Sequence, residues 1–312
     1  MKAKASSEYL PWLIGGMAFL TVLLVFGWYA HQGGNTAQQL ASKATRIDLV
    51  ERMQLDLASA SEAEKSAVLA TTDADSLTFA NQARAATAEV VQERQELGTL
   101  LVTGGSQRER DLLAQFTAAF GDLQRVDHEV LALAVKNTNL KAYALLFGPA
   151  AETLAKMDAA LDHLVATYAD STDGKQVMDM AFRARIGVLR IQTLLAPHIA
   201  EENDAKMDQM EASMTSEETQ IRTDLDGLAA IAKLAGDADL AAAKSRFVQY
   251  QEIKARILPL SRENTNVRSL TLSLNQKRKA ISLCLDALNA VRQAMLDEPI
   301  AGVTYGRAAK PR

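Results

Sequence analysis

Residues 113–168 read LAQFTAAFGDLQRVDHEVLALAVKNTNLKAYALLFGPAAETLAKMDAALDHLVATY, and the chain contains this pattern twice. Apolar residues recur at steps of three and four, which is typical of a helix that buries one stripe. The same stripe returns at a constant offset between Leu240 and Met295. Asn137-Thr138-Asn139 interrupts the first copy, and Asn264-Thr265-Asn266 interrupts the second at the same register. A shared stripe with a shared interruption indicates an internal duplication.

The composition indicates a helical protein without a nucleic-acid partner. The 312 residues carry a formal net charge of −4, and 48% of them are hydrophobic while 5% are aromatic. Charges are interleaved along helix faces and form no basic stripe, so no nucleic acid is expected as a partner. The single cysteine, Cys284, cannot form an intrachain disulfide, and its stripe position predicts a buried small hydrophobe. A crosslink between chains is the alternative.

An apolar segment near the N-terminus predicts a membrane anchor. Residues 10–30, LPWLIGGMAFLTVLLVFGWYA, are long enough to span a bilayer core. Tyr9 and Trp12 at one end, with Trp28 and Tyr29 at the other, are placed like interfacial aromatic belts. Trp28 is also too large for a signal-peptidase site, so an uncleaved anchor is expected. Lys2 and Lys4 precede it, which predicts a single-pass protein with a cytoplasmic N-terminus and the rest of the chain outside.

Turn signals divide the remainder into helices of similar length. Gly33-Gly34 predicts a flexible hinge after the anchor, Ser106 predicts a helix cap, and Gly148-Pro149 predicts a kink. Ser171-Thr172-Asp173-Gly174 is the expected linker between two modules. The predicted fold is all-α: an N-terminal transmembrane helix followed by two tandem up-down four-helix bundles. The expected boundaries are 1–34 for the tip, anchor and hinge, 35–170 and 171–297 for the modules, and 298–312 for a disordered tail.

Several segments resemble the four-helix-bundle sensor module of methyl-accepting chemotaxis receptors. Residues 88–134 (AEVVQERQELGTLLVTGGSQRERDLLAQFTAAFGDLQRVDHEVLALA) and 152–165 (ETLAKMDAALDHLV) are similar to its second, third and fourth helices. Residues 189–211 (LRIQTLLAPHIAEENDAKMDQME) look like the bend between its first two helices. The resemblance implies a periplasmic sensor on a bacterial inner membrane that works as a homodimer or beside a partner receptor. The family's return helix and cytoplasmic signalling hairpin are absent from these residues. Whether the two modules pack side by side or end to end stays open.

Catalytic motifs are missing. His31, His128, His163 and His198 are scattered, and no Glu-x-x-His, HxxxH, CxxC or phosphate-binding glycine loop is present. No metal, no cofactor and no enzymatic activity are therefore expected.

Five polar residues on or beside the apolar stripes are candidate functional residues. Asn137 and Asn264 are expected as structural caps, with a buried amide that sets helix register as the alternative. Lys277 lies in the stripe, so its ammonium must either reach solvent or meet an anion. Arg185 and Gln192 flank the stripe of residues 177–195. Because arginines between helices hold small anions in the resembling family, Arg185, Gln192 and Lys277 are the candidate ligand-binding residues.

Two functions follow from these observations. The first is a membrane-anchored, extracytoplasmic sensor-like protein that binds a small molecule or a partner protein. The second is a structural or scaffolding protein of the cell envelope that kept the bundle and lost sensing. A truncated receptor without activity of its own is a third possibility.

Overall fold

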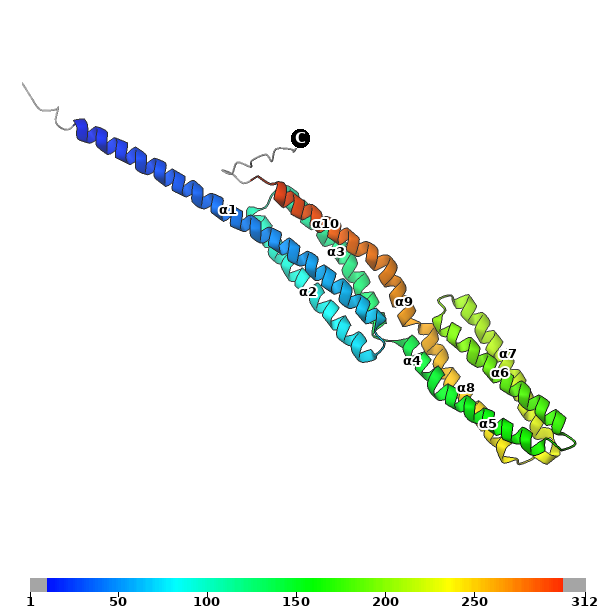
Figure 1. Ribbon diagram of the computed structural model, residues 1–312. Helices are drawn as coiled ribbons and strands as arrows, with labels where there is room; N and C mark the ends of the chain where they lie inside the picture. The colour runs from blue at the N-terminus through cyan, green and yellow to red at the C-terminus, as the bar shows by residue number, and fades with distance from the viewer. Residues whose placement is uncertain (1–9, 300–312) are drawn as a thin grey trace, which may run out of the picture. The chain divides into compact units, whose positions relative to one another are not determined.

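The computed structural model describes residues 10–299, and it describes side chains from Thr36 to Pro299 except Ala232. Every element in this range is helical, and no strand occurs in it, which confirms the all-α prediction (Figure 1). The α-helices are α1 (Leu10–Leu69), α2 (Asp73–Gly104), α3 (Gln107–Ala134), α4 (Thr138–Leu145), α5 (Ala151–Tyr168), α6 (Gly174–Ala200), α7 (Asp204–Ala230), α8 (Ala238–Glu263), α9 (Thr265–Leu272) and α10 (Arg278–Asp297). Two π-helical turns, η1 (Leu146–Ala150) and η3 (Ser273–Lys277), and a 3₁₀ turn, η2 (Ala232–Leu234), complete the set.

Helix α1 runs through the expected hinge. Gly33-Gly34 lies inside its 60 residues and does not interrupt it, so the predicted break is wrong. Each glycine disfavours a helix by only about 1 kcal/mol, which the long helical segments on both sides outweigh. Among the described residues, no helix combines the length and apolar character needed to cross a bilayer. The expected anchor, residues 10–30, falls where side chains are not described, as do residues 300–312 of the expected tail.

Among the described residues, the first compact unit comprises 10–61, 84–124 and 279–299. Its described core is built from the middle of α1, most of α2, the first part of α3, and α10. Ser106 caps α3 as the sequence predicts: its hydroxyl accepts from the Glu109 N–H at 3.3 Å. The Glu109 carboxylate in turn accepts from the Ser106 N–H at 2.9 Å, which makes a capping box. Cys284 is fully buried in this core, which confirms the small-hydrophobe prediction.

The second compact unit comprises residues 62–83 and 125–278. Helices α5, α6, α7 and α8 lie side by side in it (Figure 1). Their apolar faces close a core that includes Tyr250, Phe247, Met157, Leu161 and Leu164. A smaller cluster joins the end of α1, the start of α2 and the second part of α3 around Val130 and Leu131.

The two units do not coincide with the segments 35–170 and 171–297. The expected linker, residues 171–174, is only the turn between α5 and α6 inside the second unit. Unit 1 instead takes a helix, α10, from the far end of the chain, while α5 joins α6, α7 and α8. The order of the helices in the sequence does not predict this arrangement. The apolar stripes of α5 and α10 match, so either helix could complete either core.

The repeat of the sequence is also visible in the elements. Helices α4 and α9 both have 8 residues and start at Thr138 and Thr265, which are 127 residues apart. The π-helical turns η1 and η3 follow them immediately, each with 5 residues. Pro149 lies in η1, so the expected kink takes the form of a π-helical turn, which frees a backbone carbonyl as proline requires.

Candidate functional site

The two Asn-Thr-Asn segments meet each other inside the second unit, and we call residues 137–139 and 264–266 the Asn-Thr-Asn crossing. The Thr138 N–H donates to Thr265 Oγ1 at 3.1 Å, and the Thr265 N–H donates to Thr138 Oγ1 at 3.0 Å. The first N–H groups of a helix lack partners within it. Each threonine therefore caps the helix that the other one starts.

The asparagines extend this exchange. Asn139 and Asn266 each donate a backbone N–H to the other's side-chain oxygen, at 3.2 and 3.1 Å. The Asn139 amide also donates to Asn264 Oδ1 at 2.6 Å, and the Asn266 amide donates to Asn137 Oδ1 at 2.9 Å. Each hydrogen bond from one segment of the crossing to the other is thus matched by an equivalent bond in the opposite direction.

Asn137 and Asn264 lie at the start of α4 and α9, but their side chains do not form the expected caps. Each precedes a helix, with φ of 52° and 53°, in the left-handed region that asparagine tolerates better than most residues. Neither side chain caps its own helix. The buried amides instead bond elsewhere: Asn137 donates to Asp73 Oδ1 at 3.0 Å, and Asn264 donates to the Glu201 carbonyl at 2.6 Å.

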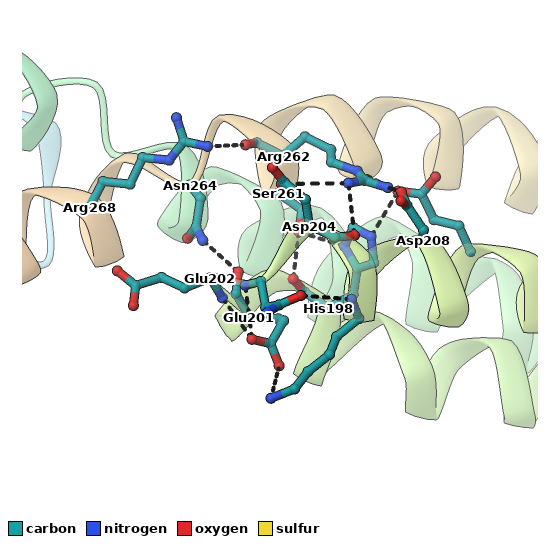
Figure 2. A network of polar contacts seen from close by, with 12 residues as sticks. His198, Glu201, Glu202, Asp204, Asp208, Ser261, Arg262, Asn264 and Arg268 are labelled. Atoms are coloured by element: carbon teal, nitrogen blue, oxygen red, sulfur yellow. Dashed lines mark hydrogen bonds and ion pairs between the residues drawn. The ribbon is translucent and has the colours of Figure 1, made fainter.

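A second polar network lies next to the crossing, at the end of α6 (Figure 2). His198 is fully buried, with Nδ1 at 2.7 Å from Ser261 Oγ of α8 and Nε2 at 2.9 Å from Glu211 Oε1 of α7. Arg262 Nε donates to the same Glu211 oxygen at 2.8 Å and its guanidinium reaches Asp208 at 2.5 Å. The His198 imidazole therefore joins three helices, α6, α7 and α8. No motif in the sequence distinguishes His198 from the other three histidines.

Burial lowers the pKa of His198 below its ordinary value, although the Glu211 carboxylate opposes the shift. Burial would raise the pKa of Glu211, but hydrogen bonds from Arg262 and His198 outweigh it and hold this pKa below the ordinary value. The ring is accordingly neutral, and Glu211 is ionised, at pH 7.

The three expected ligand-binding residues contact three different sets of partners. Arg185 pairs with Asp158 and Asp162 of α5, and its guanidinium lies 5.7 Å from the Phe182 ring centroid. An anionic ligand at Arg185 would have to displace two carboxylates. The structure does not bring Arg185 and Lys277 to a shared partner.

Gln192 takes part in the core of the second unit. Its amide donates to the Leu146 carbonyl at 3.1 Å, and its oxygen accepts from the Tyr250 hydroxyl at 2.9 Å. Leu146 begins η1, so Gln192 satisfies a carbonyl at a π-helical turn.

Of the two alternatives for Lys277, reaching solvent or meeting an anion, the structure shows the second. The 3% exposed side chain has Nζ at 2.5 Å from Asp127 Oδ1 and 2.9 Å from Glu64 Oε2. The Lys277–Glu64 contact is short enough for an ion pair, but its angles are not those of a hydrogen bond. Both Glu64 oxygens therefore lack hydrogen-bond partners. The anions here are carboxylates of the chain itself.

Glu93 is a further buried carboxyl, on α2 in the first unit. It is 7% exposed, and burial together with the nearby Asp56 raises its pKa to about 7, with Arg52 opposing. Its Oε2 has no hydrogen-bond partner. In the sequence, Glu93 is only a charged residue between apolar ones, and nothing there indicates that its carboxyl group is buried.

Glu93 should make the first unit less stable above neutral pH. Its pKa is 4.5 unfolded and about 7 folded, so the folded state holds the proton more tightly and stability falls as pH rises from 4.5 to 7. We expect Glu93→Gln to increase the free energy of unfolding by about 1–3 kcal/mol at pH 8 and to have little effect at pH 4.5. Urea titrations at both pH values measure this. The exposed Glu96→Gln is the matched control, and an equal effect of both variants at pH 8 would contradict the prediction.

One face of α6 carries apolar side chains that the described chain leaves uncovered. Met178, Phe182, Ile186 and Leu189 are 49%, 55%, 38% and 51% exposed, and we call them the α6 stripe. Their steps of four, four and three place them on one face of the helix. A groove of about 660 Å³ adjoins its start; it is lined by Thr172, Lys175, Gln176, Met178, Asp179 and Phe182.

No group of three or more metal-ligating side chains occurs among the described residues. The apolar positions close helical cores, and the polar clusters join helices to one another. Fold and site together define an all-helical bundle protein.

Comparison with protein families agrees with this class. A model described as a four helix bundle sensory module for signal transduction matches residues 16–181, more than half of the chain. The chain belongs to this family, which confirms the resemblance to the sensor module of chemotaxis receptors. The family is sensory rather than catalytic. Curated proteins give no significant match. The matched region ends inside α6, so the tandem pair of modules stays a prediction.

Proposed function

We propose that this chain is a membrane-anchored, extracytoplasmic sensor-like protein that binds a small molecule or a partner protein and passes the signal to a neighbouring receptor. The family match carries this proposal. Residues 10–30 are the proposed anchor in a bacterial inner membrane, with the N-terminus cytoplasmic and the helical units periplasmic. The signal would leave the units through helix packing with that neighbouring receptor.

A ligand screen tests the sensing part. A small molecule that binds only the folded state raises its melting temperature by mass action. The full chain in detergent micelles is melted by circular dichroism with amino acids, organic acids and related metabolites. A concentration-dependent rise with one chemical class supports sensing, whereas an unchanged melting temperature across the library favours the alternative, a structural or scaffolding protein of the cell envelope.

The α6 stripe supports the partner part of the proposal, with a second copy of this chain as the partner. An apolar stripe on one face of a helix can be buried against the same stripe of a second copy, and the charged pair Asp179–Arg183 flanks it. We expect Phe182→Glu with Ile186→Glu to convert a dimer into a monomer, because two buried charges would face each other.

Sedimentation of the full chain in detergent measures that change. Val248→Glu, at a 53% exposed apolar position on α8, is the matched control. A wild-type chain that sediments as a monomer, or a dimer that survives the double substitution, would remove the α6 stripe from the proposal.

A further inference from the structure

We infer that the His198 cluster is a proton-binding site that links the surrounding pH to the packing of α6, α7 and α8. The cluster comprises His198, Glu211, Ser261, Arg262 and Asp208. Its geometry carries the inference, because the same heavy-atom positions serve two protonation states of the ring.

The neutral ring has one donor and one acceptor. Since the Glu211 carboxylate can only accept, Nε2–H donates to it, at 2.9 Å. Nδ1 then accepts from the Ser261 hydroxyl, at 2.7 Å. All four polar atoms of this chain of contacts are satisfied.

The protonated ring has two donors, and the site accepts it without displacing a heavy atom. Nδ1–H now donates to Ser261 Oγ, and the Ser261 hydroxyl proton turns to the His198 carbonyl oxygen, 2.9 Å away. The hydroxyl rotor is the only part that must move. A buried histidine whose partners were fixed donors would not have this second arrangement.

Charges around the ring favour the proton, while burial opposes it. On α7 the facing carboxylates are Glu211, Asp208 and Asp204, and on α8 the facing cation is Arg262. Glu201 and Lys206, in and after the α6–α7 turn, pair with each other. With a neutral ring, Glu211, Asp208, Asp204 and Arg262 together carry two net negative charges, and a proton on His198 reduces this to one.

The lowered pKa of His198 sets the direction of the response. The unfolded chain takes up the proton near pH 6.5, whereas the folded chain takes it up only at lower pH. Stability is therefore present in full above pH 6.5 and is lost as the pH falls from 6.5 toward the folded pKa.

Hydrogen bonds connect the end of α6, where the cluster lies, to the rest of the second unit. The carbonyl of Ile199, the next residue, accepts from the Asn139 amide at 2.6 Å, and the carbonyl of Glu201 accepts from the Asn264 amide at 2.6 Å. The end of α6 that holds His198 is thus hydrogen-bonded to both segments of the Asn-Thr-Asn crossing. A change in α6 packing at His198 acts directly on that crossing.

Exchange of the histidine C2 proton, followed by mass spectrometry, tests the site in the full chain. The exchange rate of each histidine as a function of pH yields its own titration midpoint. We expect the midpoint of His198 to lie below pH 6.5, the ordinary value of a histidine. A His198 midpoint at or above 6.5 would overturn the inference.

Melting curves of variants test the link to packing. Between pH 7.5 and pH 5.5, the melting temperature of the wild type should fall by about 3 °C more than that of His198→Gln, whose amide keeps a donor to Glu211 but takes up no proton. His163→Gln is the control and should follow the wild type. An unchanged pH dependence in His198→Gln contradicts the inference.

Ser261→Ala is the second variant, which keeps the test decisive where His198→Gln does not fold. It removes the only acceptor for Nδ1–H, so the charged ring loses a charge-assisted hydrogen bond and the His198 midpoint should fall further. A midpoint that stays in place would show that the hydroxyl rotor plays no part, and the inference would be wrong.

Discussion

Replacing Lys277 with methionine is expected to lower the free energy of unfolding by about 3–5 kcal/mol. The ammonium is the cation that faces Asp127 and Glu64, which are 6% and 0% exposed. Methionine fills a similar volume, so the loss comes from two buried carboxyl groups without their cation rather than from a cavity. Chemical denaturation at pH 7 measures the difference.

A matched control and a partial rescue make the result specific. Lys279→Met removes a lysine two residues further on, at an exposed position, and should change stability by less than about 0.5 kcal/mol. Glu64→Gln added to Lys277→Met should recover part of the loss, because one of the two carboxyl groups no longer needs a cation. Additive effects of the two substitutions would show that Glu64 and Lys277 do not interact.

Asn264→Ala is expected to destabilise the protein by about 3 kcal/mol. Two losses combine in this variant. The Asn139 amide and the Glu201 carbonyl lose buried partners at 2.6 Å, and alanine resists the left-handed backbone with its φ of 53°.

Asn264→Gly separates these two losses. Glycine adopts a positive φ freely, so this variant should lose only the side-chain hydrogen bonds and be about 1 kcal/mol more stable than Asn264→Ala. Asn275→Ala, at an exposed position in η3, serves as the control in the same urea titrations. If the alanine and glycine variants were equally stable, the backbone conformation would have no energetic importance at the crossing.

Local patterns in the sequence predicted the helices well. Steps of three and four placed Phe116, Phe247 and Cys284 in cores, and Ser106 formed the expected cap. These features depend on neighbours within one turn of helix, and a single sequence contains that information.

Pairing between distant segments was not predictable in the same way. The stripes of α5 and α10 have the same spacing, and spacing alone does not say which core each of them closes. The partners of Lys277 lie 150 and 213 positions away in the chain, at Asp127 and Glu64. His198 was noted only as one of four scattered histidines, because Glu211 and Ser261 acquire meaning for it only once three helices are packed together.

The order of synthesis gives α10 a particular role. Residues 10–61 and 84–124 of the first unit are made early in translation, but α10, its remaining helix, begins only at Arg278. At 5–20 residues per second, the intervening chain takes roughly 8–30 s to emerge. During that interval Met53 and Phe116 lack the α10 side chains Leu288 and Val291 that complete their core. The second unit can close first, so the N-terminal part of the nascent chain must stay soluble, or be shielded by a chaperone, until the last helix arrives.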